Sequence, residues 1–141
     1  MPRKQTQVFK GNLVFGSKNA FKGHTLSRRD DLISLAYLIL YLLEGDLNFM
    51  LSDGEGSAEP DQQSEFKAIG ALKCKMTPEQ LCNTPESVKL LPFVKEIYSY
   101  SYGSEPDYNK LIMLLLQQMM NMDMAPTNEY DWNAASLLEI K

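Results

Sequence analysis

The residues best suited to polar chemistry in this chain of 141 residues are four consecutive charges, Arg-Arg-Asp-Asp at 28–31. They stand directly before residues 32–43, of which all but one serine are aliphatic, aromatic or alanine. Charges beside an apolar core need polar partners, because an unpaired buried charge is costly. Ser27 and Asp30 have the spacing of a capping box, and Gly45 is placed to end the helix. The sequence therefore predicts four structural anchors: Arg28, Arg29, Asp30 and Asp31.

Metal binding and nucleophilic chemistry have little support elsewhere in the chain. Cys74 and Cys82 are the only cysteines, their spacing is not C-x-x-C, and His24 is the only histidine. These are too few ligands for a metal set. We interpret both cysteines as free thiols in a reducing compartment, and we predict no catalytic residue, metal or cofactor.

The apolar run 32–43 predicts a helix at the centre of a domain, because a helix that is apolar on all sides cannot lie on a surface. A membrane span is the alternative, but a bilayer requires roughly 20 apolar residues and this run is much shorter. The N-terminal sequence MPRKQTQVFK lacks an apolar region, so no secretory signal is expected.

Helix-start patterns and apolar spacing predict about four further helices, and hence a mainly α fold. Residues 51–61 are predicted to form a loop, and any strand is short and near 12–15. The first helix is expected at 61–73, with Phe66, Ile69 and Leu72 on one face, and a short second helix is expected to start at the capping box 77–80. The third is expected from 84 to about 98, with Val88, Leu91 and Val94 pointing inward and a kink at Pro92. The last is expected to start at 104–107, with Leu111, Leu114, Leu115 and Met119 toward the core.

The charge is unevenly distributed along the chain. Residues 1–29 contain seven basic residues and no acidic one, whereas residues 30–141 contain seven lysines and eighteen acidic residues. A cationic arm on an acidic body suggests an acidic partner surface, or docking of the arm on its own body. A solvated arm that pairs loosely with the body is the alternative, and the pattern does not favour nucleic acid. The candidate partner-binding residues are Lys4, Lys10, Lys18 and Lys22.

Several motifs resemble casein kinase I-type protein kinases, in the order in which that family has them. S-R-R-D-D-L-I-S-L-A-Y at 27–37 resembles the family's S-R-R-D-D-L-E-S-L-G-Y, and 11–19 stand where the family has G-T-A-R-Y-A-S-I-N. Residues 77–82 are similar to T-P-x-E-x-L-C, residues 105–108 to K-P-D-Y, and residues 130–133 to the closing F-D-W. Agreement of several motifs in order is more specific than any one of them.

The resemblance implies the lower part of a kinase C-terminal lobe, with the 27–45 helix at its centre. The parts that carry out phosphoryl transfer have no counterpart in the sequence: it contains no G-x-G-x-x-G, no H-R-D and no D-F-G. In family terms the chain begins inside the activation segment. We therefore expect no kinase activity from the chain alone, and no ATP as cofactor.

Some retained positions depart from the family pattern. Asn12 stands for a threonine that lines the substrate channel, Val14 for an arginine that holds anionic substrates, and Ala36 for a glycine. Asn and Phe at 48–49 replace Pro-Trp. Asp31 is retained, and in the family it anchors the catalytic loop. Here it is expected either to cap its own helix or to meet a partner chain.

These observations predict an arm at 1–26, similar to the end of an activation segment, and a helical domain at 27–141. Tyr108 and Trp132 complete the structural anchors, because they lie in the motifs that resemble the family. In a whole kinase other segments cover the central helix, so one flank of 32–43 is expected to be exposed.

The predicted function is a non-catalytic structural subunit that binds protein partners in a larger assembly. One half of a split kinase completed by another chain, and a truncated gene model, are the alternatives. The expected setting is cytoplasmic, with a cytoskeletal or ciliary assembly and an acidic surface such as a microtubule as candidates, and without a membrane.

Overall fold

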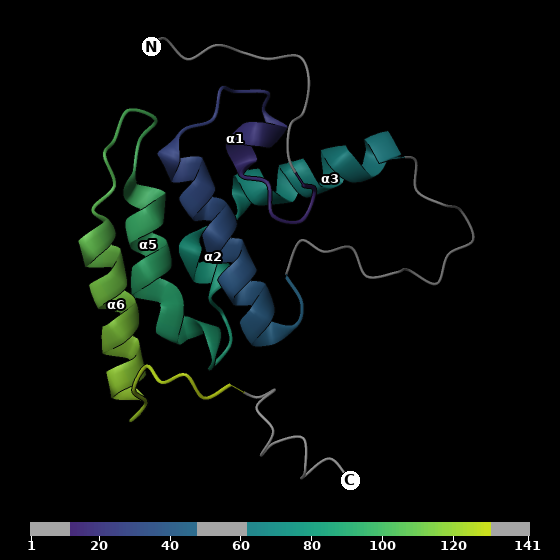
Figure 1. Cartoon of the computed structure of the whole chain (residues 1–141). Coiled ribbons are helices and arrows are strands. Elements are labelled where there is room, and N and C mark those ends of the chain that lie inside the picture. The colour runs from purple at the N-terminus through teal and green to yellow at the C-terminus, as the bar shows by residue number, and fades with distance from the viewer. Residues whose placement is uncertain (1–11, 48–61, 131–141) are drawn as a thin grey trace, which may run out of the picture.

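The computed structural model describes residues 12–47 and 62–130, and helices are the regular elements of that part (Figure 1). No strand occurs in either described range. The helices, in chain order, are α1 Lys18–Phe21, α2 Arg28–Glu44, α3 Gln62–Lys75, α4 Pro78–Leu81, the 3₁₀ helix η1 Ser87–Leu90, α5 Leu91–Ser99 and α6 Tyr108–Asn121. The mainly α fold expected for a piece of a kinase C-terminal lobe is confirmed.

Helix α2 begins and ends at the predicted signals. The amide of Ser27 donates to Asp30 Oδ2 at 2.9 Å, which satisfies a free donor at the helix start. Gly45 has φ 75° and its amide donates to the Tyr41 carbonyl at 2.8 Å. Glycine suits this left-handed position because it has no Cβ.

The core forms where α2 packs against α5. Burying one large aliphatic or aromatic side chain contributes about 1.5–3 kcal/mol, so these two helices supply much of the stability. Helix α2 contributes the buried residues Leu32, Ile33, Ala36, Tyr37 and Leu40, and α5 contributes Phe93, Val94 and Ile97.

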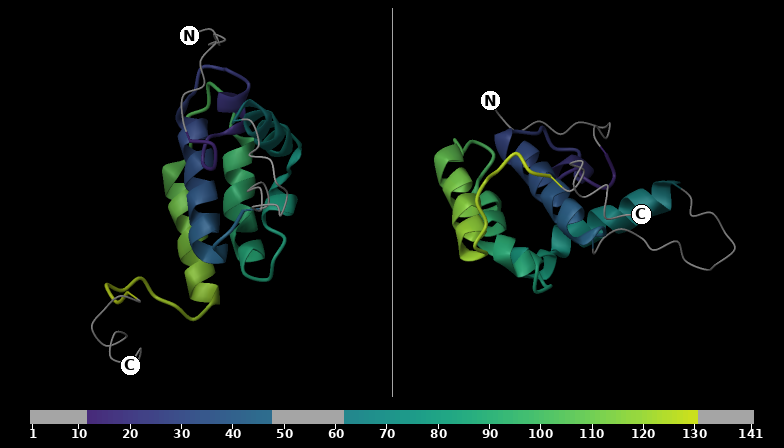
Figure 2. Two further views of the ribbon diagram at one scale, coloured as in Figure 1. Left: turned by 90° about the vertical axis from the view of Figure 1, so that its right-hand side faces the viewer. Right: turned by 60° about the horizontal axis from the view of Figure 1, so that its bottom comes forward.

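Helices α2, α5 and α6 lie side by side, with α5 in contact with both of the others (Figure 1). Helix α3 crosses the upper part of this layer, and the short α1 packs on it (Figure 2). On one side of this layer, residues of α2 and α6 line a common groove.

The segment predicted as one helix from 84 to about 98 is instead two helices. Residues 87–90 form the 3₁₀ helix η1 and α5 starts at Leu91, so Pro92 lies in the first turn of α5. Proline is tolerated there because its missing N–H would have no partner within the helix. The prediction of a kink at Pro92 is therefore wrong, and Val88, predicted to point inward, is exposed.

Two other local predictions also differ from the structure. Residues 12–15 form a turn, in which Asn12 Oδ1 accepts hydrogen bonds from the amides of Val14 and Phe15 at 2.8 and 3.2 Å. An asparagine side chain commonly directs such a turn. Helix α3 buries Ile69 as expected, but Leu72 is exposed and Lys73 is buried in its place. The loop predicted at 51–61 lies outside the described residues.

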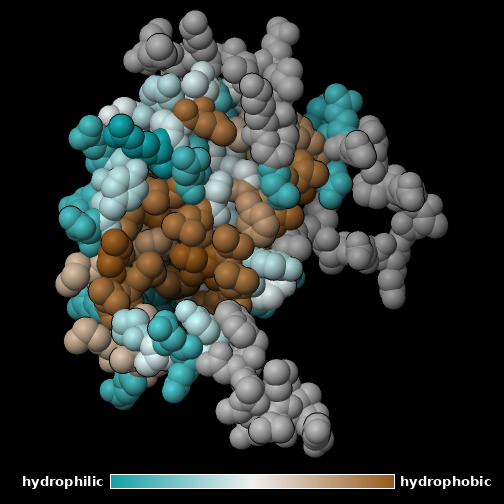
Figure 3. All heavy atoms as spheres, viewed as in Figure 1, coloured by the Kyte–Doolittle hydropathy of each residue, from teal (hydrophilic) through white to brown (hydrophobic). Residues whose placement is uncertain are grey.

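The flank of α2 that was expected to be uncovered is indeed exposed. Figure 3 shows an apolar, hollowed area on the face that α2 and α6 present in Figure 1. The exposed leucines of α2 are Leu35, Leu38, Leu42 and Leu43. Among the described helices, none is both long and apolar enough to span a bilayer.

Candidate functional site

A buried carboxylate at the start of α2 binds the segment that precedes the helix. Asp30 is 1% exposed, and its Oδ1 accepts hydrogen bonds from Ser17 Oγ at 2.6 Å and Asn19 Nδ2 at 2.8 Å. Its Oδ2 also lies 3.7 Å from Nε of Arg29, whose side chain is largely buried. Hydrogen bonds to charged groups stabilise more than neutral ones, so Asp30 holds Ser17 and Asn19 firmly against α2.

A buried lysine of α3 binds the same segment from the other side. Lys73 is 0% exposed, and its Nζ donates to the carbonyl oxygens of Leu13, Val14 and Gly16 at 2.8, 2.7 and 2.6 Å. The aromatic ring of Phe21 lies 4.7 Å from the ammonium group. Three acceptors use all three protons of an ammonium group, which favours its charged form.

Burial has the opposite effect on Lys73 and lowers its pKa from 10.5 to about 7. The ring of Tyr37 lies 4.9 Å from Nζ on a second side. A cation over an aromatic face is stabilised by the ring, so the rings and the carbonyls together replace the water that Lys73 loses.

Asp30 also lines a small pocket between residues 12–17 and the start of α2. Its volume is about 220 Å³. Asp31 lies at this pocket with an exposed side chain, next in sequence to the buried Asp30. The residues that line it are Asn12, Phe15, Gly16, Ser17, Ala20, Leu26, Asp30, Asp31 and Ser34.

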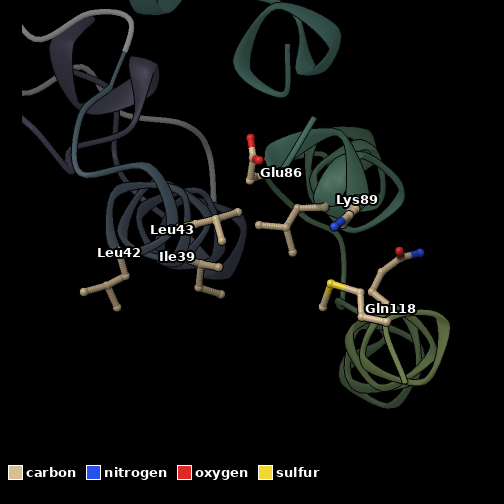
Figure 4. Close-up of a pocket in the computed structure, with 8 residues that line it drawn as sticks. Ile39, Leu42, Leu43, Glu86, Lys89 and Gln118 are labelled. Atoms are coloured by element: carbon tan, nitrogen blue, oxygen red, sulfur yellow. The ribbon is translucent and has the colours of Figure 1, made fainter. Parts of the chain in front are cut away.

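The second candidate site is an apolar groove between α2 and α6, with a volume of about 340 Å³. Figure 4 shows side chains from α2 on one side, facing those from η1 and α6. Ile39 and Leu43 point into the space, while Lys89 and Gln118 approach from the opposite side (Figure 4). The groove is lined by Ile39, Leu42, Leu43, Glu86, Lys89, Leu90, Gln118 and Met122.

The remaining predicted anchors are not brought together with Asp30. Arg28 is exposed and lies 3.6 Å from Glu105, a surface pair that contributes little. Tyr108 is exposed in the first turn of α6. Trp132 lies outside the described residues.

The predicted partner-binding lysines are only partly described. Lys18 lies in α1, with its Nζ 5.6 Å from the ring centre of Tyr98. Lys22 is exposed at the end of α1, whereas Lys4 and Lys10 lie outside the described residues. Residues 12–26 therefore pack on the helical body, through α1 on α3 and through Ser17 on Asp30.

Sequence reasoning missed Lys73 and the pair Ser17 and Asn19. Lys73 lies four residues after Ile69 and seven after Phe66, so helical spacing alone places it on the buried face of α3. Ser17 and Asn19 belong to the stretch 11–19 that resembles the family, but nothing local identifies Asp30 as their acceptor.

Groups suited to metal binding or thiol chemistry are few in the described part of the chain. Across 12–47 and 62–130, no cluster of three histidine, cysteine or acidic side chains could hold a metal ion. Both described cysteines are free, and burial raises the pKa of Cys82 from 9.0 to about 11. A raised thiol pKa disfavours the reactive thiolate.

The mainly helical fold and the motifs around its central helix are consistent with the C-terminal lobe of a protein kinase. No family model matches it. The resemblance to casein kinase I is nevertheless confirmed by individual relatives, which match about 94% of the chain.

Three relatives illustrate the extent of this match. Casein kinase I homolog 3 of Saccharomyces cerevisiae is 29% identical over 133 residues, which are 94% of this chain and 24% of the relative. Casein kinase 1-like protein HD16 of Oryza sativa is 34% identical over 114 residues, 79% of this chain and 14% of the relative. Casein kinase I homolog 1 of Schizosaccharomyces pombe is 24% identical over 140 residues, 94% and 28% of the two chains. The chain thus spans less than a third of each relative's length.

Proposed function

We propose that this chain is a non-catalytic, kinase-like scaffold that binds a protein partner through the exposed side of α2. The observation that carries the proposal is the apolar groove, which continues the exposed leucine stripe of α2. Contiguous exposed apolar surface is characteristic of interaction sites in soluble proteins. The sequence supports the non-catalytic part, because it contains no G-x-G-x-x-G, H-R-D or D-F-G motif.

The shape of the groove suits an amphipathic helix. Side chains of α2 and α6 line two sides of the groove, and η1 lies between them and contributes Lys89 and Leu90 to the lining. A helix can place apolar residues at i, i+3, i+4 and i+7 into such a groove. Glu86 and Lys89 at its edge would add charge selectivity.

The test is partner capture with a groove variant and a matched control. Leu43 lines the groove and is 47% exposed, whereas Met113 of α6 does not line it and is 63% exposed. We expect tagged chain carrying Leu43→Glu to lose the partners that copurify with wild type, and the Met113→Glu chain to retain them. Equal partner recovery from both variants would contradict the proposal.

A split kinase completed by another chain is the second candidate, and the position of Asp31 favours it. This carboxylate is exposed at the pocket between residues 12–17 and α2, where backbone N–H groups of another polypeptide could reach it. Asn12 and Val14 argue against it, since the family has threonine and arginine there. Magnesium- and ATP-dependent phosphorylation by a complex of this chain with one carrying the missing motifs, abolished by Asp31→Ala, would support this alternative.

We further propose that the partner assembly presents an acidic surface in the cytoplasm, for which a microtubule is a candidate. The support is the excess of basic residues in 1–29 over an acidic body. Cosedimentation with microtubules at low and high salt tests this part separately from the groove.

A further inference from the structure

Helix α6 carries apolar residues on two opposite faces. On its outer face Ile112, Met113 and Met120 are 54%, 63% and 73% exposed. A helix at the surface of a domain normally has polar residues on its outer face, and an apolar one is costly in water. The inner face packs on the core through Leu111, Leu114 and Leu115.

The outer face has the residue spacing of a helix that pairs with another helix. Asn109, Met113, Leu116 and Met120 follow one another at intervals of four, three and four residues. This alternation places the four side chains on one stripe, as at the a and d positions of paired helices. Helix α6 lies at the edge of the layer in Figure 1, with α5 and η1 packed on its inner side. We call these four residues the outer stripe.

The outer stripe is free of charge. No ionisable side chain occurs from residue 111 to residue 122. Lys110, directly before this stretch, pairs with Glu96 of α5 at 2.8 Å. A helix that lies on a membrane carries basic residues beside its apolar face, whereas Asp107 and Asp123 flank α6. The face therefore suits another protein surface that is itself uncharged.

A second copy of this chain provides such a surface. Two-fold symmetry brings the same patch of each copy together, so any charge on the patch would face its like, and the outer stripe has none. The exposed polar residues beside it are Gln117 and Asn121. Their amide groups both donate and accept hydrogen bonds, so they need no oppositely charged partner.

We propose that two copies of this chain associate through the outer stripe of α6, as an antiparallel pair of helices. The two-fold axis lies between Met113 and Leu116, so that Met113 meets Leu116 of the second copy and Asn109 meets its Met120. The antiparallel direction places the positive end of each helix dipole beside the negative end of the other. Methionine side chains are flexible and adapt to an opposing surface.

The size of the stripe sets the strength of the association. A helix of 14 residues is about 21 Å long, so the contact is smaller than the roughly 800 Å² per partner of a standard stable interface. We therefore expect a reversible dimer with a micromolar dissociation constant. This inference does not rest on the proposed function, because the outer stripe contributes no residue to the lining of the apolar groove.

Sedimentation velocity of the full-length chain, from micromolar to several hundred micromolar, measures the association. We would compare wild type with Met113→Glu in the stripe and Leu43→Glu in the groove. Wild type and Leu43→Glu should change from monomer to dimer with rising concentration. Met113→Glu should raise the dissociation constant at least about tenfold, because symmetry places two carboxylates in the contact. Circular dichroism should show the same helix content in all three.

Cysteine cross-linking tests the antiparallel register. In a Cys74→Ser background, which removes the exposed native thiol, a mixture of Asn109→Cys and Met120→Cys chains should form a disulfide-linked dimer on mild oxidation. Met120→Cys alone should not, because its two copies would lie about 16 Å apart along the helices and a disulfide requires Cα atoms within about 7 Å.

Three results would overturn the proposal. The first is a chain that remains monomeric at every concentration. The second is dimerisation that is lost in Leu43→Glu and retained in Met113→Glu, which would place the contact at the groove. The third is cross-linking of Met120→Cys to itself, which would show parallel helices. None of these measurements depends on partner capture, so the scaffold proposal stands or fails separately.

Discussion

The ammonium group of Lys73 lies 2.6 Å from the carbonyl oxygen of Gly16, although 57 residues separate the two in sequence. This contact, with those to Leu13 and Val14, fastens the turn before α1 to α3. The next residue, Ser17, binds Asp30 of α2. A single short segment thus joins α3 to the central helix through two buried charges.

Lys73→Met should strongly destabilise the fold. It retains most of the apolar stem but leaves three carbonyl groups without their donor, and we expect a loss of about 3 kcal/mol in the free energy of unfolding. Urea unfolding followed by circular dichroism measures the change. Lys75→Met, at an exposed position of the same helix, should remain within about 0.5 kcal/mol of wild type. Equal effects from the two substitutions would show that the carbonyl contacts contribute nothing specific.

The stability of the chain should rise with pH between about 7 and 9 because of Lys73. Its pKa is about 7 in the folded chain and 10.5 when unfolded, so over this interval the unfolded chain binds more protons. The contribution of Lys73 to stability is therefore most favourable above its unfolded pKa of 10.5, and it becomes least favourable once the pH has fallen below its folded pKa of about 7. Cys82 acts in the opposite sense, since its pKa is raised to about 11 from 9.0, but mainly above pH 9.

Midpoints of urea unfolding at several pH values would measure this dependence in wild type and in Lys73→Met. We expect the slope between pH 7 and 9 to be reduced in the variant. A wild-type stability that is flat or falls over this interval would show that the three carbonyls hold Lys73 charged against the effect of burial.

Asp30→Asn should destabilise the chain, whereas Asp31→Asn should not. Asp30 accepts three hydrogen bonds as a buried carboxylate, and its replacement removes the charge and places a donor beside Ser17 or Asn19. We expect a cost of about 2–3 kcal/mol. Asp31 is exposed, so the neighbouring substitution is a close control. Matching thermal melts of the two variants would contradict the assignment of Asp30 as the organising residue.

The sequence predicted the elements whose signals are local. Ser27, Asp30 and Gly45 mark the limits of α2, and the capping box at Thr77 and Gln80 marks the start of α4. Such signals act through neighbouring backbone groups, so they can be read without knowing the tertiary structure. The apolar run of α2 likewise predicted its central position, whereas its uncovered flank was expected from the resemblance to a kinase lobe that lacks the covering segments.

The unpredicted features depend on contacts between distant segments. Lys73 is buried because the turn at 12–16 supplies carbonyl acceptors, and no local pattern shows that pairing. No local pattern shows which of the two neighbouring aspartates becomes buried. Asp30 is buried because Ser17 and Asn19 donate hydrogen bonds to it, whereas Asp31 lines a pocket. The break before α5 depends on how Ser87 and Thr84 satisfy the local backbone, which shortens the helix predicted from Thr84.

The isolated chain should neither bind ATP nor phosphorylate casein. Phosphoryl transfer depends on a glycine-rich loop, a lysine, a catalytic aspartate and metal-binding side chains, and the sequence contains none of the corresponding motifs. A thermal shift with magnesium and ATP, together with radiolabel transfer to casein, measures both properties. Transfer that persists through repeated purification and is lost in Asp31→Ala would overturn the expectation and favour the split kinase.

The basic residues near the N-terminus should contribute to partner binding through charge and not through folding. Replacing Lys4, Lys10, Lys18 and Lys22 with glutamine removes four positive charges from the region that has no acidic residue. Because salt screens exposed charges beyond about 8 Å at physiological ionic strength, the loss of affinity should be larger at low salt than at high salt. Lys18 lies near the ring of Tyr98, so a chain with only the other three replacements controls for this contact. Binding isotherms at several salt concentrations, with thermal melts of the same samples, separate the two effects. A loss of thermal stability in the triple variant, or a loss of affinity independent of salt, would show that these lysines support the fold or bind by specific contacts instead.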